Sequence, residues 1–188
     1  MHVGDLYICR HGETEWSLSG QHTGITDLPL TENGVRQAQE LAEKIRGHHF
    51  AKVFTSPLMR AKHTCEICGF PHASIDEDLF EWRYGDYEGK KTSEIRDTVP
   101  GWNIFDNGAP NGETPQQISD RADRMIRKIR TIDGDVAIFS SGHFSRALAA
   151  RWLGFPVTLG KHLILSTATL SILGYERENP AIKQWNAR

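Results

Sequence analysis

The chain has 188 residues, and its 22 Lys and Arg against 24 Asp and Glu give a formal net charge of −2 at pH 7. This balance argues against a nucleic-acid partner or a membrane-surface binder, and no stretch approaches the roughly 18 apolar residues of a membrane span. Residues 1–5 lack signal-peptide character and three cysteines suit a reducing compartment, so we expect a cytoplasmic protein with one domain over residues 1–188.

The first part of the chain alternates between short apolar runs and apolar residues at helical spacing, which favours an α/β domain. Residues 3–9 predict the first strand. Residues 31–47 predict a helix with Thr31 as its N-cap and Gly47 as its stop. Residues 53–54 predict a short second strand.

The next helix is expected to begin at Pro57, with Ser56 as its cap, and to end about Gly69. It contains Cys65 and Cys68 in a C-x-x-C arrangement. A zinc site would need two more ligands, and a redox site would need a thioredoxin-like context that is missing. We therefore interpret this pair as semi-buried small residues of a helix.

Residues 84–113 are rich in Gly, Pro, Asn and aromatic residues and predict a long excursion over one face, with one short helix near 92–98. Long loops of this kind in compact domains are usually functional. Thr114-Pro115 then opens an amphipathic helix that runs to about Arg130, and its arginines are expected to form a solvated face.

Residues 135–139 form the clearest buried strand, and a helix through Leu153 is expected to follow it. Residues 169–175 and 182–185 predict a terminal hairpin that turns at Asn179-Pro180. Terminal strands of this kind could pair edge to edge, so a homodimer is a possible assembly.

Four short segments carry side chains suited to catalysis, and three of these segments stand just past the end of an expected strand. Arg10 and His11 follow the first strand, and Arg60 stands near the start of the helix after the second strand. Glu81 precedes the long excursion, and His143 follows the clearest buried strand. If the strands are parallel, these side chains meet in one crevice. Arginine forks bind phosphoryl oxygens in pairs and a histidine can be a nucleophile, so the set suits phosphoryl transfer.

Each of these residues alone has an ordinary structural explanation. Arg60 could be a surface residue of a helix, Glu81 a loop carboxylate, and His143 a hydrogen-bonded core histidine. The ordered set is far more specific than any one member.

The motifs that repeat a known family pattern are, in chain order, Arg10-His11-Gly12-Glu13-Thr14, Thr23-Gly24, Leu30-Thr31-Glu32-Asn33-Gly34, Ser56-Pro57-Leu58-Met59-Arg60-Ala61, Glu81 with Tyr84-Gly85 and Glu88-Gly89, Gly112-Glu113-Thr114, and Ser141-Gly142-His143. As a set they resemble the histidine phosphatase superfamily, which includes the cofactor-dependent phosphoglycerate mutases. The resemblance implies a three-layer α/β/α sandwich with a mixed, mainly parallel central sheet.

The resemblance also implies roles. His11 would be the nucleophile that becomes a phosphohistidine, while Arg10, Arg60 and His143 would grip the transferred phosphoryl group. Glu81 would protonate the leaving oxygen and then take a proton from the attacking water. Neighbouring guanidinium groups would keep His11 unprotonated. No metal and no cofactor is required, because the arginines and His143 supply the positive charge.

Two positions depart from the family pattern. Ser17 stands where an asparagine near the phosphate is frequent, and Phe144 stands where glycine usually follows the second histidine, so that Phe144 is expected to crowd or line the pocket. The remaining residues expected to bind substrate or phosphate are Thr23, Gly24 and Tyr84.

Three functions are compatible with these residues. The family's mutases carry extra sequence between the glutamate and the second histidine and a C-terminal tail over the site. The compact spacing here, with the chain stopping at Arg188, therefore favours hydrolysis over a mutase reaction. A silent binding module of the same fold is a third interpretation, and the intact Glu81 and histidines argue against it.

The expected substrate is a small phosphorylated metabolite, either a sugar phosphate or a sugar-acid phosphate. The chain looks similar to small sugar-phosphate phosphatases of the family, including sedoheptulose-1,7-bisphosphatase-like members. Arg83, Lys90 and Lys91 are candidate contacts for a distal anion, with solvated loop charges as the alternative interpretation.

Overall fold

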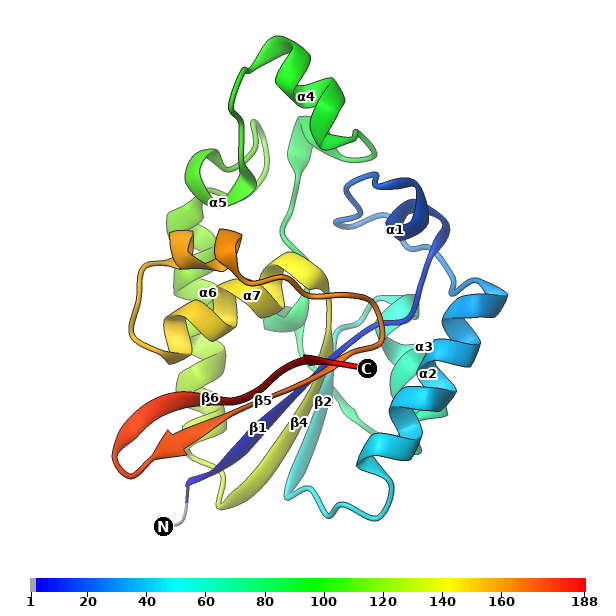
Figure 1. Cartoon of the computed structure of the whole chain (residues 1–188), viewed down its shortest axis with the longest axis vertical. Helices are drawn as coiled ribbons and strands as arrows, with labels where there is room; N and C mark the ends of the chain where they lie inside the picture. Colours follow the sequence, from blue (N-terminus) through cyan, green and yellow to red (C-terminus); the bar gives the residue numbers. More distant parts are fainter. Residues whose placement is uncertain (1–2) are drawn as a thin grey trace.

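The computed structural model describes residues 3–188, so that Met1 and His2 of the N-terminal segment lie outside the described residues (Figure 1). The elements, in chain order, are β1 (Val3–Arg10), α1 (Glu15–Ser19), α2 (Glu32–Ile45), β2 (Lys52–Thr55), α3 (Met59–Ile67), β3 (Ser74–Ile75), the 3-10 helices η1 (Glu77–Leu79) and η2 (Gly85–Tyr87), α4 (Thr92–Thr98), α5 (Ile104–Asn107), α6 (Pro115–Arg130), β4 (Gly134–Ser140), α7 (Gly142–Trp152), the 3-10 helix η3 (Val157–His162), β5 (Leu170–Glu176) and β6 (Asn179–Ala187). Within this part of the chain, no helix combines the length and the apolar character needed to cross a bilayer.

One six-stranded sheet has the order β3-β2-β4-β1-β5-β6. The pairs β3–β2, β2–β4 and β4–β1 are parallel, whereas β5 runs antiparallel to β1 and β6 antiparallel to β5. The predicted mixed, mainly parallel sheet is thereby confirmed. In the β1–β4 pair, Arg10 lies opposite Ser140, so the next residue of each chain segment leaves the sheet at the same level.

Alternate residues of the central strands face two separate cores. Leu6 and Ile8 of β1 belong to the larger core, which α6 and α7 cover. Cys9 and Phe139 belong to the smaller core, which α2 and α3 cover. Figure 1 shows α2 and α3 together on the right of the sheet and α6 and α7 on its left. The period-two alternation therefore produces the three layers.

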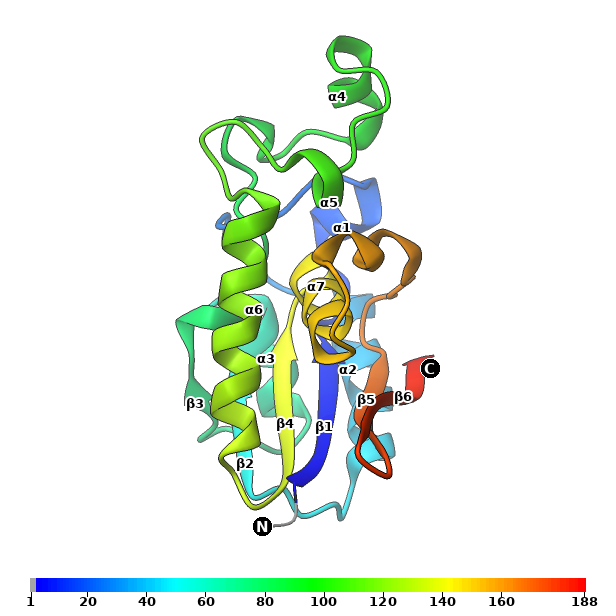
Figure 2. The ribbon, with the colours of Figure 1, turned by 90° about the vertical axis from the view of Figure 1, so that its left-hand side faces the viewer.

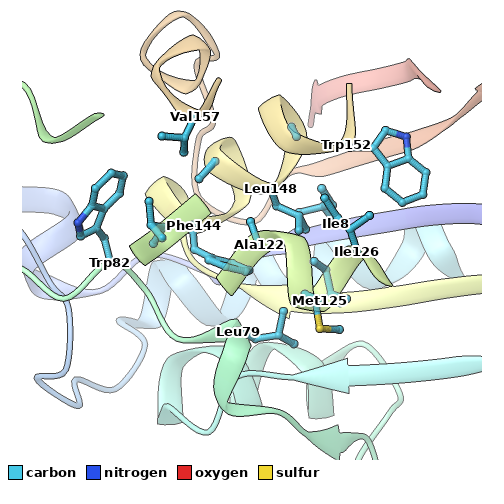
Figure 3. Packing of buried hydrophobic residues seen from close by; sticks show 14 of the residues in the cluster. Ile8, Leu79, Trp82, Ala122, Met125, Ile126, Phe144, Leu148, Trp152 and Val157 are labelled. Carbon is cyan, nitrogen blue, oxygen red and sulfur yellow. The ribbon is translucent and has the colours of Figure 1, made fainter. Parts of the chain in front are cut away.

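The larger core contains the biggest buried side chains of the chain. Figure 3 shows Phe144 from α7 among side chains of α6, with Leu79 and Trp82 at the edge of the same cluster. These residues come from the segment that precedes the long excursion and from the helix that follows β4. The core thus ties together the two segments that carry Glu81 and His143.

The excursion over residues 84–113 lies beyond the carboxyl ends of β1 and β4, where Figure 2 shows α4 and α5 at one end of the molecule. The short helix predicted near 92–98 is confirmed by α4. Two further short helices, η2 and α5, were not predicted, because three or four residues are too few to show a helical period.

The predicted start of α3 is wrong by two residues. The helix begins at Met59 with Leu58 as its N-cap, not at Pro57 with Ser56 as the cap. Ser56 instead extends the hydrogen bonding between β2 and β4, since its N–H donates to the Phe139 carbonyl at 2.9 Å. The cap comes from a remote loop instead: the Asp27 carboxylate accepts from the Met59 N–H at 2.7 Å.

The terminal hairpin is confirmed, but the predicted position of its turn, at Asn179-Pro180, is too late in the chain. Asn179 and Pro180 are the first two residues of β6, and Arg177 takes the turn with φ of 57°. Pro180 is tolerated because β6 is an edge strand, which has no neighbouring strand on its outer side that would need the missing N–H.

Candidate active site

A cavity opens just past the carboxyl ends of β1 and β4, between the loop after α1, the excursion and the first turn of α7. Its lining residues are Arg10, His11, Ser17, Gln21, His22, Thr23, Glu81, Tyr84, Gly142, His143, Arg146 and Leu165. The structure therefore brings Arg10, His11, Glu81 and His143 to one place, as the parallel strands led us to expect.

His11 is buried, with 4% of its surface exposed. Its Nδ1 lies 2.7 Å from the Gly12 carbonyl, which can only accept a hydrogen bond, so Nδ1 carries the proton and Nε2 keeps a lone pair. Burial is the main cause that holds the pKa of His11 well below its ordinary 6.5, and the charges of Arg60 and Arg10 act in the same direction. The ring is consequently neutral at neutral pH, and its Nε2 has the lone pair that a nucleophile requires.

The Glu81 carboxylate stands at the N-terminus of α7. Oε1 accepts from the N–H groups of Trp82 at 2.8 Å and Phe144 at 2.7 Å, and Oε2 accepts from the N–H of His143 at 2.9 Å. A helix N-terminus is a favourable place for a carboxylate, and these donors fix its direction. Oε2, with a single donor, retains a lone pair on which a proton can be carried.

His143 stands in the first turn of α7, where its Nδ1 is hydrogen-bonded to the Tyr84 hydroxyl. Burial raises the pKa of Tyr84 well above 10, so the phenol keeps its proton. This bond orients the His143 ring, and its Nε2 has no hydrogen-bond partner among the described residues. Burial, followed by the charge of Arg146, holds the pKa of His143 well below 6.5.

The two predicted arginines are anchored by backbone carbonyls. Arg60, fully buried, donates from Nη1 to Thr26 at 3.0 Å and from Nη2 to Thr23 at 3.1 Å and Gly24 at 2.9 Å. Arg10 donates from Nη1 to the Leu165 carbonyl. Burial lowers the pKa of both below the ordinary value of a guanidinium group, which remains charged in a protein all the same.

Three buried polar atoms in this region have no hydrogen-bond partner among residues 3–188: Arg10 Nε, Arg60 Nε and the Ser141 hydroxyl. Buried polar atoms are normally paired, and two of these three are cationic donors. The strand register also places Ser141, rather than His143, level with His11, because Arg10 lies opposite Ser140. The Ser141 hydroxyl is thus buried level with His11, although Ser141 does not line the cavity.

Phe144 does not crowd or line the pocket, which corrects the prediction. Its side chain is fully buried in the larger core, and only its backbone N–H serves the site, through Glu81 (Figure 3). Gly24 also stays outside the cavity lining. Its N–H donates to Glu88 at 2.8 Å, and a Cβ there would lie 2.8 Å from the Trp82 carbonyl oxygen, so the position needs glycine for close packing.

The predicted distal-anion contacts Arg83, Lys90 and Lys91 are all exposed, and none of them lines the cavity. The Arg83 guanidinium lies 5.9 Å from the centre of the Phe80 ring, and the Lys90 ammonium lies 5.6 Å from the centre of the Tyr87 ring. The three residues fit the alternative interpretation of solvated loop charges.

Arg146 and His22 line the cavity and were missed. Arg146 stands one turn after His143 on α7, donates from Nε to the Gly160 carbonyl at 2.9 Å, and packs on the Phe105 ring at 4.8 Å. His22 lies 4.8 Å from the Tyr84 ring centre, and burial lowers its pKa to about 4. The i, i+3 spacing of His143 and Arg146 was the available signal; His22 offered none.

Ser17 and Thr23, two of the residues predicted to contact phosphate, line the cavity. The Ser17 hydroxyl is shared with the capping box of α1: it accepts from the Thr14 N–H at 2.8 Å and donates to the Thr14 carbonyl at 3.0 Å. These bonds occupy its only proton, so Ser17 can contact an anion as a donor only if the second bond opens.

The cysteines do not contribute to the site. Cys9, Cys65 and Cys68 are free and buried in the smaller core, and burial raises the pKa of each thiol. Across residues 3–188, no three His, Cys, Asp or Glu side chains gather in a way that could hold a metal ion.

Comparison with known proteins gives a consistent answer. The sequence model of the histidine phosphatase superfamily (branch 1) matches residues 6–188. An acid phosphatase of Mycobacterium tuberculosis is 39% identical over 91% of this chain and 86% of its own length. The sedoheptulose 1,7-bisphosphatase of Saccharomyces cerevisiae is 39% identical over 80% of this chain and 68% of its own length. The solved structure of the Rv3214 product of M. tuberculosis superimposes with a TM-score of 0.93 at 34% identity, covering 98% of this chain and 97% of that one.

Proposed function

Since the chain belongs to the histidine phosphatase superfamily and is a phosphatase of that family, we propose that it hydrolyses a small phosphorylated metabolite through a phosphohistidine on His11, without the help of a metal ion. The observation that carries this proposal is the state of His11. A buried imidazole with its proton fixed on Nδ1 presents the Nε2 lone pair to a cavity lined by arginine and by Glu81.

In the first step, Nε2 of His11 attacks phosphorus and the bond from phosphorus to the ester oxygen breaks. Glu81 gives its proton to the departing oxygen, so the product leaves as an alcohol. Arg10, which lines the cavity, would bind the phosphoryl oxygens, and Arg60, which is fully buried and outside the cavity lining, would add its positive charge from behind the cavity wall. In the second step Glu81 takes a proton from water, the water oxygen bonds to phosphorus, and phosphate leaves His11.

We propose that His143 donates from Nε2 to an oxygen of the bound substrate. For the substrate itself, a sugar phosphate or sugar-acid phosphate is supported by the polar character of the cavity wall and by the name of the yeast relative. Arg146, rather than the exposed loop cations, would bind a second anionic group of the substrate, because its positive charge lies inside the cavity.

The test is release of inorganic phosphate from a panel of sugar phosphates, sugar-acid phosphates and p-nitrophenyl phosphate, with a chelator present and His11→Ala beside the wild type. We expect chelator-resistant release that disappears in the variant, and a phosphoenzyme that is labile in acid and stable in base. Conversion of 3-phosphoglycerate to its 2-isomer with a bisphosphate primer, without phosphate release, would instead establish the mutase alternative.

Two further variants test whether His143 and Ser141 act on the transferred phosphoryl group. If His143 grips the transferred phosphoryl group, His143→Ala lowers kcat for every substrate, including p-nitrophenyl phosphate. If it contacts the remainder of the substrate, the variant raises KM for the metabolite alone. Ser141→Ala is measured in parallel, because the register places that hydroxyl level with His11.

The cytoplasmic location and the homodimer stay predictions. The three free, buried cysteines support a reducing compartment. Size-exclusion chromatography with light scattering measures the assembly directly.

A further inference from the structure

Glu81 lies in a stretch of chain that has no regular structure of its own. Residues 81–84 belong to neither a helix nor a strand. Backbone groups in such a stretch cannot be paired by a helix or a sheet, so side chains from elsewhere must satisfy them if the stretch is to be held in one position. For a group that has to deliver a proton to one oxygen atom, this position matters.

Arg121 of α6 bonds to the backbone of Glu81 and of the residues just before it. Its Nη1 donates to the carbonyls of Asp78, at 2.9 Å, and Phe80, and its Nη2 donates to the carbonyl of Glu81 at 3.2 Å. Its remaining donors, on Nε and Nη2, bond to the two oxygens of Glu113 at 2.8 and 2.7 Å. All five N–H donors of the guanidinium are therefore used. The prediction of a solvated arginine face on α6 is wrong at this position, where 7% of the side chain is exposed.

Glu113 completes the arrangement from the other side. Its Oε2 accepts from the Arg83 N–H at 2.9 Å, its N–H donates to the Arg83 carbonyl at 2.8 Å, and its carbonyl accepts from Nε1 of Trp82 at 2.9 Å. The segment that carries Glu81 is thus held on both sides, by Arg121 before and at Glu81 and by Glu113 just after it.

A third contact connects Arg121 with the carboxylate indirectly, through Phe144. The guanidinium carbon lies 4.6 Å from the centre of the Phe144 ring, and the N–H of Phe144 donates to Oε1 of Glu81. Arg121 therefore contacts both the chain that carries Glu81 and the residue of α7 that orients its carboxylate. Arg121 and Glu113 do not line the cavity, so neither of them touches the substrate.

We propose that Arg121 and Glu113 form a positioning pair that holds the Glu81 carboxyl group at the place from which it protonates the leaving oxygen, an inference that rests on the proposed function. A buried pair with a purely structural role would lower stability when broken, but it would affect all substrates alike. Breaking a positioning pair instead slows the reaction of each substrate in proportion to how much its leaving group needs a proton from Glu81.

Leaving groups differ in this need. The p-nitrophenolate ion departs without a proton, whereas the alkoxide of glycerol phosphate or a sugar phosphate must be protonated. The quantity to compare is kcat/KM, because it reports the step in which phosphohistidine forms and excludes the later step that both substrates share. Glu81→Gln sets the reference, with a large loss for the alkyl phosphate and a small one for p-nitrophenyl phosphate.

Arg121→Lys keeps a positive charge but offers three donors in place of the five-donor fork. We expect it to lower kcat/KM for the alkyl phosphate about ten- to hundredfold, within the range that a general acid contributes, and to change p-nitrophenyl phosphate less than about threefold. Arg124→Gln is the matched control on the same helix: 52% of its side chain is exposed, and it bonds to the Asp78 carboxylate. Both substrates should keep the wild-type value in that control.

Thermal unfolding of each variant accompanies the kinetics. If Arg121→Lys does not fold, Glu113→Gln carries the test, because its amide has one acceptor oxygen in place of two and leaves either the Arg83 N–H or Nε of Arg121 without its acceptor. Equal losses for the two substrates in a folded variant, or no loss for either, would overturn the positioning role. The failure of the proposed function has a different signature, namely no His11-dependent release of phosphate by the wild-type protein.

Discussion

Acid should destabilise this protein well above the pH at which carboxylates titrate, because three cavity histidines are held unprotonated in the folded state. Burial lowers the pKa of His22 to about 4 and holds the pKa values of His11 and His143 well below 6.5. In the unfolded chain these rings titrate near about 6.5. Below that pH the unfolded state therefore binds protons that the folded state does not, and the free energy of unfolding must fall as the pH falls.

The magnitude follows from the width of the window. Each histidine costs about 1.4 kcal/mol of stability per pH unit between its unfolded and folded pKa, so His22 alone removes about 2 kcal/mol between pH 6.5 and 5. His11 and His143, whose pKa values are lowered in the same direction, add to this loss. The share of His22 alone is already a large fraction of the stability of many domains, about 5–15 kcal/mol.

The assay is urea unfolding followed by the fluorescence of the five tryptophans, at intervals from pH 7.5 to 5, in buffers free of phosphate so that no anion fills the cavity. His22→Gln should reduce the pH slope by about one proton, or 1.4 kcal/mol per pH unit. His63→Gln, which replaces an exposed histidine on α3, is the control and should leave the slope as it is. Equal stability at pH 7.5 and 5 would refute the reasoning.

Two other predictions concern the two cores. Phe144→Ala should lower the free energy of unfolding by about 3–5 kcal/mol, because the ring is fully buried, and a loss below about 1 kcal/mol in urea titration would contradict that placement. Cys9, Cys65 and Cys68 should not react with an aromatic disulfide reagent at pH 8 until the protein unfolds, because burial raises their pKa values; prompt labelling of the native protein would show that the smaller core opens.

Much of the framework was already fixed by local sequence. The apolar runs of β1 and β4 and the helical spacing of α2 and α6 placed these elements within a few residues, because each pattern lies in one stretch of chain. The strand end at Arg10 and His11 could be located for the same reason. Pieces separated by 60 to 130 residues could be assigned to one site because parallel strands deliver their ends to one edge.

Tertiary structure alone decided which way individual side chains turn. Phe144 follows His143 directly, yet one enters the core and the other the cavity, since successive residues of a helix point about a quarter turn apart and the packing of α6 selects the buried direction. In the sequence, Arg121 is indistinguishable from a surface arginine of an amphipathic helix. In the structure it is buried by the irregular segment around Glu81, to which it donates hydrogen bonds. His22 enters the cavity through a loop with no period at all. Local periodicity determines elements, whereas the burial of a charged or polar group depends on partners from distant parts of the chain.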